Sequence, residues 1–387
     1  MQNRSTQLLL NVGHAIDHMF LLIFATAVSA IATEFGIGRW EDLMPYSVAA
    51  FFLFGIGSLP CGKLGDQWGR RPMMLIFFLG MGLASIGVSF TQTPMQMALA
   101  LALLGAFASI YHPVAIPMLV QGATRPGWTI GVNGLCGNLG VALAAVVTGF
   151  FVKYYGWRMA FFIPGLLSLV CGAAFAKWAT QEASPPAKKK TSAVQASGMA
   201  MPTLLLVMTL ASTSSSLLFN LSTNSNYELL ANKLNAISQD PAQIGMLLGL
   251  VYATASLTQL WVGHMIDKYP LKQLYLRILV CQALVLIAAT QVEGWWFYGV
   301  QFLFMAGVFG AIPFTDAMIV RFVDDTMRSR VTGMRLAVSF GASSLAVLLI
   351  GPIVKQSGFT TLLAIMAASS VVTLGVISQL PQSNAKA

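Results

Sequence analysis

The sequence predicts an all-α polytopic membrane protein with twelve transmembrane helices arranged as two pseudo-symmetric six-helix bundles. Three observations lead to this fold class: the composition, a series of long apolar segments, and a polar stretch near the midpoint of the chain. Of the 387 residues, 56% are hydrophobic and 9% are charged, whereas soluble domains carry about 25% charged residues. A soluble globule cannot enclose so much apolar surface, so we expect lipid to surround the protein.

Twelve apolar segments have the length that a bilayer requires. A transmembrane helix needs about 20 predominantly apolar residues to cross the hydrocarbon core. The first segment is longer than a signal-peptide core and contains ionisable residues, so we expect it to remain in the mature protein. The predicted spans lie near 7–33, 44–64, 73–91, 95–120, 129–151, 158–178, 201–227, 242–264, 273–291, 295–320, 331–354 and 358–380.

The net charge of +9 is explained by membrane topology. The basic residues lie in short gaps between apolar segments and form no stripe of the kind that binds nucleic acid, so we expect no nucleic-acid partner. With the N-terminus in the cytoplasm, the densest basic groups, Arg70-Arg71 and 188–190, fall on the inner side. The positive-inside rule therefore predicts that both termini are cytoplasmic.

A polar stretch near the midpoint separates two halves. It contains Pro185-Pro186, a run of three lysines and many Ala and Ser residues, which is the composition of a linker. We therefore divide the chain into an N-terminal six-helix bundle over 1–180, a cytoplasmic linker over 181–200 and a C-terminal six-helix bundle over 201–387.

The gap between the second and third spans carries the most specific motif in the chain. It reads Gly62-Lys63-Leu64-Gly65-Asp66-Gln67-Trp68-Gly69-Arg70-Arg71-Pro72, and it closely resembles the signature loop of the major facilitator superfamily, Gly-x-Leu-x-Asp-x-x-Gly-Arg-Arg/Lys. A degenerate copy runs from Gly263 to Lys268 in the second half. The resemblance implies the major facilitator fold and a monomeric transporter that works by alternating access.

The motif also has a physical interpretation. Its glycines permit a close helix approach, and Asp66 can face the positive N-terminal end of a helix. The resemblance implies that this partner is the eleventh helix, beginning near Val331, and that the contact closes the inner gate. A merely topogenic loop would explain the arginines but not the aspartate. The predicted gating residues are Gly62, Gly65, Asp66, Arg70, Arg71 and Asp267.

Three further patches resemble the fosmidomycin-resistance branch of efflux transporters. They are His14 with Asp17, the run Tyr111-His112-Pro113, and the run Gly137-Asn138-Leu139-Gly140. This resemblance implies efflux rather than uptake, but not the same drug or strict antiport. The chain departs from that branch at Val114, where an acidic residue is usual, and at Ala144-Ala145, where Gly-Pro is usual.

Ionisable groups inside a membrane are costly, so the few present are candidate functional residues. At about 100° per residue, Asn11, His14, Asp17 and His18 fall within an arc of roughly 120° that we expect to face a central cavity. His112 precedes Pro113, which frees a backbone carbonyl and can kink its helix.

The second half adds further candidates. Asp316 lies near Pro313 in the tenth span, with Arg335 as its possible counter-ion. The resemblance implies that the first, fourth, seventh and tenth helices line the cavity, so we expect Asp316 to approach the His and Asp residues of the first half. The seventh span carries neutral polar residues that could orient a solute or hydrogen-bond between helices: Thr213, Ser216, Asn220, Thr223, Asn224 and Tyr227.

We therefore expect a secondary active transporter of a small polar or anionic organic solute in the bacterial cytoplasmic (inner) membrane, working by proton-coupled efflux. Asp17, with His14 or His112, is the expected proton carrier, and Asp316 is the second candidate. No nucleotide-binding loop is present to use ATP, and we expect no cofactor. The predicted coupling and substrate residues are His14, Asp17, His18, His112, Asn220, Asn224, Asp316 and Arg335.

Other interpretations of the same residues remain open. His14, Asp17, His18 and His112 could instead ligate a divalent transition metal, which would make the protein a metal transporter. The protein could also be an uptake permease, or Asp17 could simply pair with a histidine in packing. An intramembrane hydrolase is disfavoured because neither a His-Glu-x-x-His pattern nor a nucleophile with a neighbouring base is evident. A non-transporting receptor on the same fold would be distinguished by a flux assay.

Overall fold

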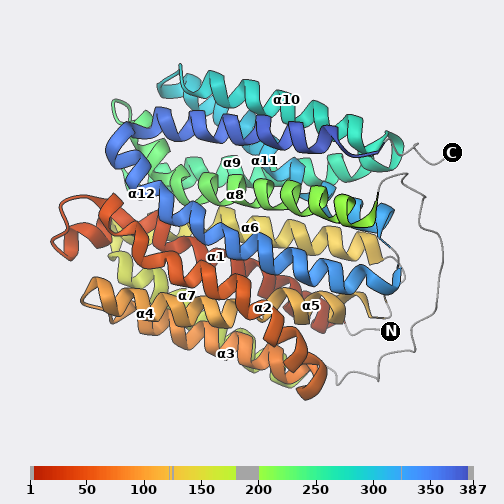
Figure 1. The fold of residues 1–387 in the computed structure, drawn as a ribbon. Helices are drawn as coiled ribbons and strands as arrows, with labels where there is room; N and C mark the ends of the chain where they lie inside the picture. Colours follow the sequence, from red (N-terminus) through yellow and green to blue (C-terminus); the bar gives the residue numbers. More distant parts are fainter. Residues whose placement is uncertain (1–3, 122, 124–125, 180–199, 324, 382–387) are drawn as a thin grey trace.

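The computed structural model describes residues 4–121, 123, 126–179, 200–323 and 325–381, and every regular element among them is helical (Figure 1). The first half contains α1 (Arg4–Glu34), η1 (Trp40–Asp42), η2 (Met44–Ser47), α2 (Val48–Trp68), α3 (Arg70–Ser89), α4 (Pro94–Ala108), α5 (Tyr111–Val120), α6 (Pro126–Tyr154) and α7 (Trp157–Trp178). The second half contains α8 (Met201–Lys233), α9 (Pro241–Lys268), α10 (Leu271–Ala289), α11 (Gly294–Phe322) and α12 (Asp325–Ser378). Nearly all of the predicted linker, residues 181–199, lies outside the described residues.

The predicted number of spans is confirmed once α12 is divided. Eleven stretches of the described chain are long and apolar enough to cross a membrane. The last of them, Gly333–Ser378, has 46 residues and contains Gly358, which has a non-helical backbone with φ of 76°. The chain reverses there (Figure 1), and this positive φ favours glycine because it has no Cβ. The stretch is therefore two spans, and the total is twelve.

The two ends of the bundle are distinguished by where the first helix begins and the last helix ends. The start of α1 and the end of α12 lie at the same end of the bundle (Figure 1), as an even number of crossings requires. We call this the terminal end and the opposite one the far end. The far end holds the turns that follow α1, α3, α6, α8 and α10 and the reversal within α12.

Small residues allow the halves to pack closely against one another. Helix α6 packs on α9, and α12 packs on α2. A Cβ added to Gly149 of α6 would lie 2.5 Å from the carbonyl oxygen of Pro241 in α9, and one added to Gly55 of α2 would overlap the backbone nitrogen of Gly341 in α12. Such close backbone approaches are typical of helix packing in membranes.

The far end is closed in this conformation. Three polar pairs join the first half to the second there, and the ring of Trp40 stacks on that of Phe359 with 6.1 Å between centroids. The three pairs are Ser29 with Glu228, Asp42 with Lys355, and Lys153 with Asp240.

The predicted span near 95–120 is bent at its centre. Helix α4 ends at Ala108 and α5 begins at Tyr111. Pro113 has no N–H to donate to the carbonyl of Ser109, four residues earlier, so the helix breaks at that position. This break corresponds to the kink predicted at Pro113, and it places His112 in the first turn of α5.

Candidate functional site

The candidate site is built on the middle of α1, where polar side chains face α5 and α6. Most of α1 is buried by neighbouring helices. His14 is 6% exposed and Asp17 is completely buried. The polar arc predicted for this helix therefore points into the protein and away from lipid.

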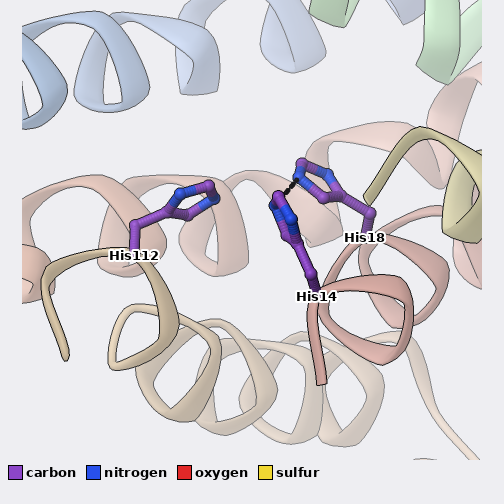
Figure 2. A group of neighbouring side chains, drawn as sticks. All are labelled: His14, His18 and His112. Atoms are coloured by element: carbon purple, nitrogen blue, oxygen red, sulfur yellow. Dashed lines mark hydrogen bonds between the residues drawn. The ribbon is translucent and has the colours of Figure 1, made fainter. Parts of the chain in front are cut away.

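His14 has a fixed orientation and a definable tautomer. Its Nδ1 lies 2.7 Å from the backbone carbonyl oxygen of Asn133 in α6. A carbonyl can only accept a hydrogen bond, so Nδ1 carries the proton and the neutral ring presents a lone pair on Nε2. His18 Nε2 lies 3.2 Å from that atom, and the dashed line in Figure 2 marks this hydrogen bond. Because His14 Nε2 holds the lone pair, His18 is the donor.

A second layer of contacts holds His14 in place. The ring of Tyr111 stacks on it with 4.7 Å between centroids. The Tyr111 hydroxyl donates to the carbonyl of Leu10 at 2.7 Å, and the Asn133 amide donates to that hydroxyl at 2.8 Å and to Asn11 Oδ1 at 2.9 Å. The ring orientation therefore depends on groups from three helices.

The glycines of the Gly-Asn-x-Gly run make this arrangement possible. A Cβ added to Gly137 would lie 2.7 Å from the His14 ring, and one added to Gly140 would lie 2.7 Å from the Cα of Ala15. Both distances are shorter than real Cβ contacts allow. Glycine at these two positions therefore brings α6 against the polar face of α1.

Asp17 and His112 form the least satisfied part of the site. The Asp17 Oδ2 atom lies 3.8 Å from His112 Nε2. Neither carboxylate oxygen of Asp17 has a hydrogen-bond partner in the described part of the chain, and neither does His112 Nε2. An unpartnered carboxylate in an apolar interior costs several kcal/mol if ionised. This pair is therefore a candidate for reversible protonation.

The surroundings of His112 connect this pair to both halves. Its ring contacts Phe54 of α2, with 5.9 Å between centroids, and Phe340 of α12, with 5.4 Å. The two phenylalanines stack on each other at 4.7 Å. A movement of α12 relative to α2 would therefore change the environment of the histidine.

The three histidines also have a geometry that could hold a metal ion. One ring nitrogen from each of His14, His18 and His112 lies within 4.8 Å of the others, and Figure 2 shows the rings turned toward one another. The backbone hydrogen bond at His14 Nδ1 leaves Nε2, which accepts from His18 here, as the atom that would ligate a metal, and this is the usual arrangement for a metal-ligating imidazole.

Asp316 makes its polar contact in the second half. Arg335 donates to its Oδ1 at 2.7 Å, so the predicted counter-ion is present. The Asp316 side chain is 58% exposed and that of Arg335 is 10% exposed, and Arg335 Nε has no hydrogen-bond partner among the described residues. The structure thus brings His14, Asp17, His18 and His112 into contact, while Asp316 pairs with Arg335.

The polar stripe of α8 is largely occupied by internal hydrogen bonds in this conformation. The Asn220 amide donates to the Ser216 carbonyl and to Ser343 Oγ, both at 2.9 Å. The Asn224 amide donates to the Asn220 carbonyl at 3.1 Å. Of these three bonds, the one from Asn220 to Ser343 joins α8 to α12, as the interhelical alternative requires, and the other two lie within α8.

The signature loop packs at the terminal end. A Cβ added to Gly65 would lie 3.1 Å from the Val114 side chain, and one added to Gly62 would lie 3.4 Å from Pro113. Asp66 is exposed. The side chain of Asp267 is outside the described part of the structure, so the gating role of this loop stays a prediction.

The two arginines of the loop donate hydrogen bonds to the ends of neighbouring helices. Arg71 donates to the carbonyls of Ala176 and Ala179 at 2.6 and 3.0 Å, which satisfies acceptors at the C-terminal end of α7. Arg70 donates to Gln121 Oε1 at 3.4 Å.

One ionisable residue of interest was not found from the sequence. Glu228 of α8 is buried and accepts a hydrogen bond from Ser29 Oγ at 2.7 Å. The predicted span ended at residue 227, whereas α8 continues to Lys233. An ionisable residue close to the end of an apolar segment is easily mistaken for part of a loop.

Comparison with known proteins identifies the family. The family model for the Major Facilitator Superfamily matches residues 10–230 and 195–385. Multidrug resistance protein MdtG of Citrobacter koseri is 24% identical over 302 residues, covering 76% of this chain and 73% of the relative. MdtG of Proteus mirabilis is 23% identical, covering 77% and 76%.

Solved structures agree in fold. A crystal structure of a D-xylose-proton symporter has a TM-score of 0.82 at 13% identity, covering 99% of both chains. An inward-open structure of the xylose transporter XylE from E. coli has a TM-score of 0.80 at 13% identity, covering 98% of this chain and 97% of that one. The chain therefore belongs to the major facilitator superfamily, and it is a multi-pass membrane transporter rather than an enzyme.

Proposed function

We propose that this transporter exports a small polar or anionic organic solute across the bacterial inner membrane, driven by protons that bind at Asp17. The observation that carries the proposal is the buried Asp17 carboxylate, which has no hydrogen-bond partner in the described structure and lies 3.8 Å from His112 Nε2. The direction of transport is supported by the relatives, which are named multidrug resistance proteins.

The proton has a physical role in this scheme. When Asp17 is protonated, the neutral acid can remain between the tightly packed helices of the closed conformation. When it is ionised, the charge favours a conformation in which water reaches the site. Proton binding therefore biases the equilibrium between the two conformations, which is the requirement for coupling.

The orientation of the molecule follows from the charge distribution of the sequence. With both termini in the cytoplasm, the terminal end faces inward and the far end faces outward. The conformation closed at the far end is then the one that accepts solute from the cytoplasm. Proton entry from outside would complete an exchange cycle.

The preference for a polar or anionic solute is supported by Arg335. Its side chain is 10% exposed, it is bound to Asp316 on one side, and its Nε lacks a partner among the described residues. A mostly buried guanidinium with a free donor suits a carboxylate or phosphonate group.

A divalent transition metal is the rival cargo. The three histidine nitrogens within 4.8 Å of one another favour it, and Asp17 would supply a fourth, anionic ligand. Transport of an organic solute and transport of a metal predict different responses to the same experiment.

The experiment measures proton release from purified protein in detergent while polar solutes, antibiotics and divalent metals are added, comparing the intact chain with Asp17→Asn. We expect at least one organic solute to release protons from the intact chain and none from the variant. If only metals release protons, and His18→Ala abolishes the release, the metal function replaces this proposal. If solutes bind, as seen by thermal stabilisation, but nothing releases protons, the proposed coupling at Asp17 is wrong.

A further inference from the structure

Glu228 lies where the two halves meet near the far end. It belongs to α8 of the second half and its side chain is buried. Ser29 of α1, in the first half, donates its hydroxyl hydrogen to Glu228 Oε1 at 2.7 Å. This contact can exist only while α1 and α8 are together, so it reports directly on closure of the far end.

The surroundings of Glu228 offer no cation to balance a negative charge. In the described part of the chain, no lysine, arginine or histidine nitrogen lies within ion-pair distance of its carboxylate. The nearest titratable groups are Tyr227 on the same helix and Glu41 in η1, and neither stabilises an anion. On α9, the hydroxyl of Tyr252 donates to the backbone carbonyl of Thr223 and not to Glu228.

The cations at this end of the molecule are engaged elsewhere. Among the described residues, each of them pairs with a carboxylate other than Glu228. A single hydroxyl donor does not offset the cost of removing an ionised carboxylate from water. The closed far end therefore favours the neutral acid form of Glu228. The engaged pairs are Arg39 with Glu41, Lys153 with Asp240, Arg158 with Glu34, Lys233 with Glu293, and Lys355 with Asp42.

We propose that Glu228 is a second proton-binding carboxylate, which is protonated while the far end is closed and releases its proton to solvent when the far end opens. Opening separates α1 from α8, breaks the contact with Ser29 and admits water that solvates the ionised carboxylate. The O–H bond of the acid breaks and the proton passes to water. Closure reverses both steps. The inference rests on the proposed alternating-access function, but it does not require Asp17.

A quantitative consequence follows from linkage. One extra proton bound in the closed state makes the ratio of closed to open molecules rise as pH falls, by at most about tenfold per pH unit. The pair between Lys153 and Asp240 does not imitate this response near neutral pH, because the hydrogen bond from Lys153 holds the pKa of Asp240 below its ordinary value. It remains ionised throughout that range.

Pulsed electron paramagnetic resonance can measure the ratio. Spin labels are placed at Gln92→Cys, between α3 and α4, and at Gln291→Cys, between α10 and α11, after the native cysteines are replaced by serine. Both positions are exposed at the far end, in opposite halves. In the otherwise intact chain we expect the short-distance population to grow as pH falls from 9 to 5, approaching tenfold per unit over part of that range.

Three variants distinguish ionisation of Glu228 from other causes of the pH response. We expect Glu228→Gln to remove the part of the pH response that Glu228 supplies. In the Asp17→Asn background it should hold the far end mostly closed at every pH, because the amide keeps the contact with Ser29 but cannot ionise. Ser29→Ala retains the carboxylate and should keep the pH response. Asp17→Asn should also keep it, so failure of the function proposed for Asp17 would not be confused with failure here. Because Asp17 can bias the same equilibrium, the deciding comparison is made in the Asp17→Asn background. A flat ratio there, or a pH response that persists there after Glu228→Gln is added, overturns the proposal.

A spectroscopic measurement gives a second test that does not depend on gating. Infrared difference spectra of the intact protein should contain a protonated carboxyl band that is absent in Glu228→Gln. Ser29→Ala should move this band to higher frequency, because its hydrogen bond to the carbonyl oxygen is lost. If the band is unchanged in both variants, Glu228 is not protonated in the closed state and the proposal is wrong.

Discussion

The Asp17 carboxylate and the His112 imidazole face each other at 3.8 Å without a hydrogen bond to anchor either of the facing atoms. Most buried polar groups are paired, so this unpaired arrangement supports the proposal that the protonation of Asp17 changes during transport. His112 also contacts Phe340 of the second half, which connects the protonation site to relative movement of the two halves.

Replacing His112 tests the partner role of the imidazole. We expect His112→Gln to reduce proton-driven transport by roughly tenfold or more, equivalent to about 1.4 kcal/mol in the barrier. Solute exchange without a proton gradient should be much less affected. His264→Gln is a matched control, because His264 is exposed at the end of α9. Equal losses in the two variants would show that the effect is not specific to the site.

Asn133 tests the layer that supports His14. The variant Asn133→Ala retains the backbone carbonyl that accepts from His14 but removes the amide donor to Asn11 and Tyr111. Hydrogen bonds between membrane helices contribute about 0.6 kcal/mol on average. We therefore expect a loss of about 1–2 kcal/mol in unfolding free energy, measured by denaturant titration in micelles. Gln239→Ala, at an exposed position, should be neutral, and an equally stable Asn133→Ala would contradict the described network.

Two glycines of α6 provide a test variant and its matched control. A Cβ at Gly140 would meet the backbone of Ala15, whereas one at Gly131 would have no neighbour within 4 Å. Overpacking typically costs about 1–3 kcal/mol. We expect Gly140→Ala to lower the melting temperature and transport, and Gly131→Ala to leave both unchanged. Tolerance of alanine at Gly140 would argue against the close packing of α1 on α6.

The ion pair between Lys355 and Asp42 should favour the closed far end. The two side chains are 42% and 47% exposed and lie 2.5 Å apart, and exposed pairs contribute about 0.2–1 kcal/mol. Lys355→Asp should therefore raise the open population by up to about fivefold, as measured with the spin-label pair described above. The exchanged variant, Asp42→Lys with Lys355→Asp, should restore closure, and a failure to do so would remove the charge explanation.

The pair between Lys153 and Asp240 predicts a pH dependence of stability. The hydrogen bond from Lys153 lowers the pKa of Asp240 below its ordinary value. The pair therefore stabilises this conformation above about pH 4, and the contribution is lost as pH falls through the lowered pKa. The difference in melting temperature between the intact chain and Asp240→Asn should be constant from pH 5 to 8 and shrink below pH 4. A difference that varies between pH 5 and 8 would contradict this assignment.

Most of the fold could be predicted from hydropathy, because every membrane-spanning helix must satisfy its own backbone and present apolar side chains to lipid. The bend at Pro113 could also be predicted, since proline removes a defined hydrogen bond. Helix ends were harder to place. Helix α8 continues to Lys233, since its last turns are buried by other helices, and a hydropathy window does not detect that protection.

The polar face of α1 could be predicted from helical periodicity, but its partners could not. The contact between His14 and Asn133 joins residues 119 positions apart, and its acceptor is a backbone carbonyl that any residue could provide. The contact between Ser29 and Glu228 spans 199 positions. Only the packing of α1 against α6 and α8 determines these pairs, and no local pattern encodes it.

The central claim is that protonation of Asp17 drives transport. The most direct measurement uses proteoliposomes that contain the solute identified by proton release, in which an imposed pH gradient drives the solute against its concentration gradient. The intact chain should accumulate solute in proportion to the gradient. Asp17→Asn should show no accumulation while still exchanging labelled for unlabelled solute at equal pH. Full gradient-driven accumulation by Asp17→Asn would contradict the account and leave Asp17 as a packing residue.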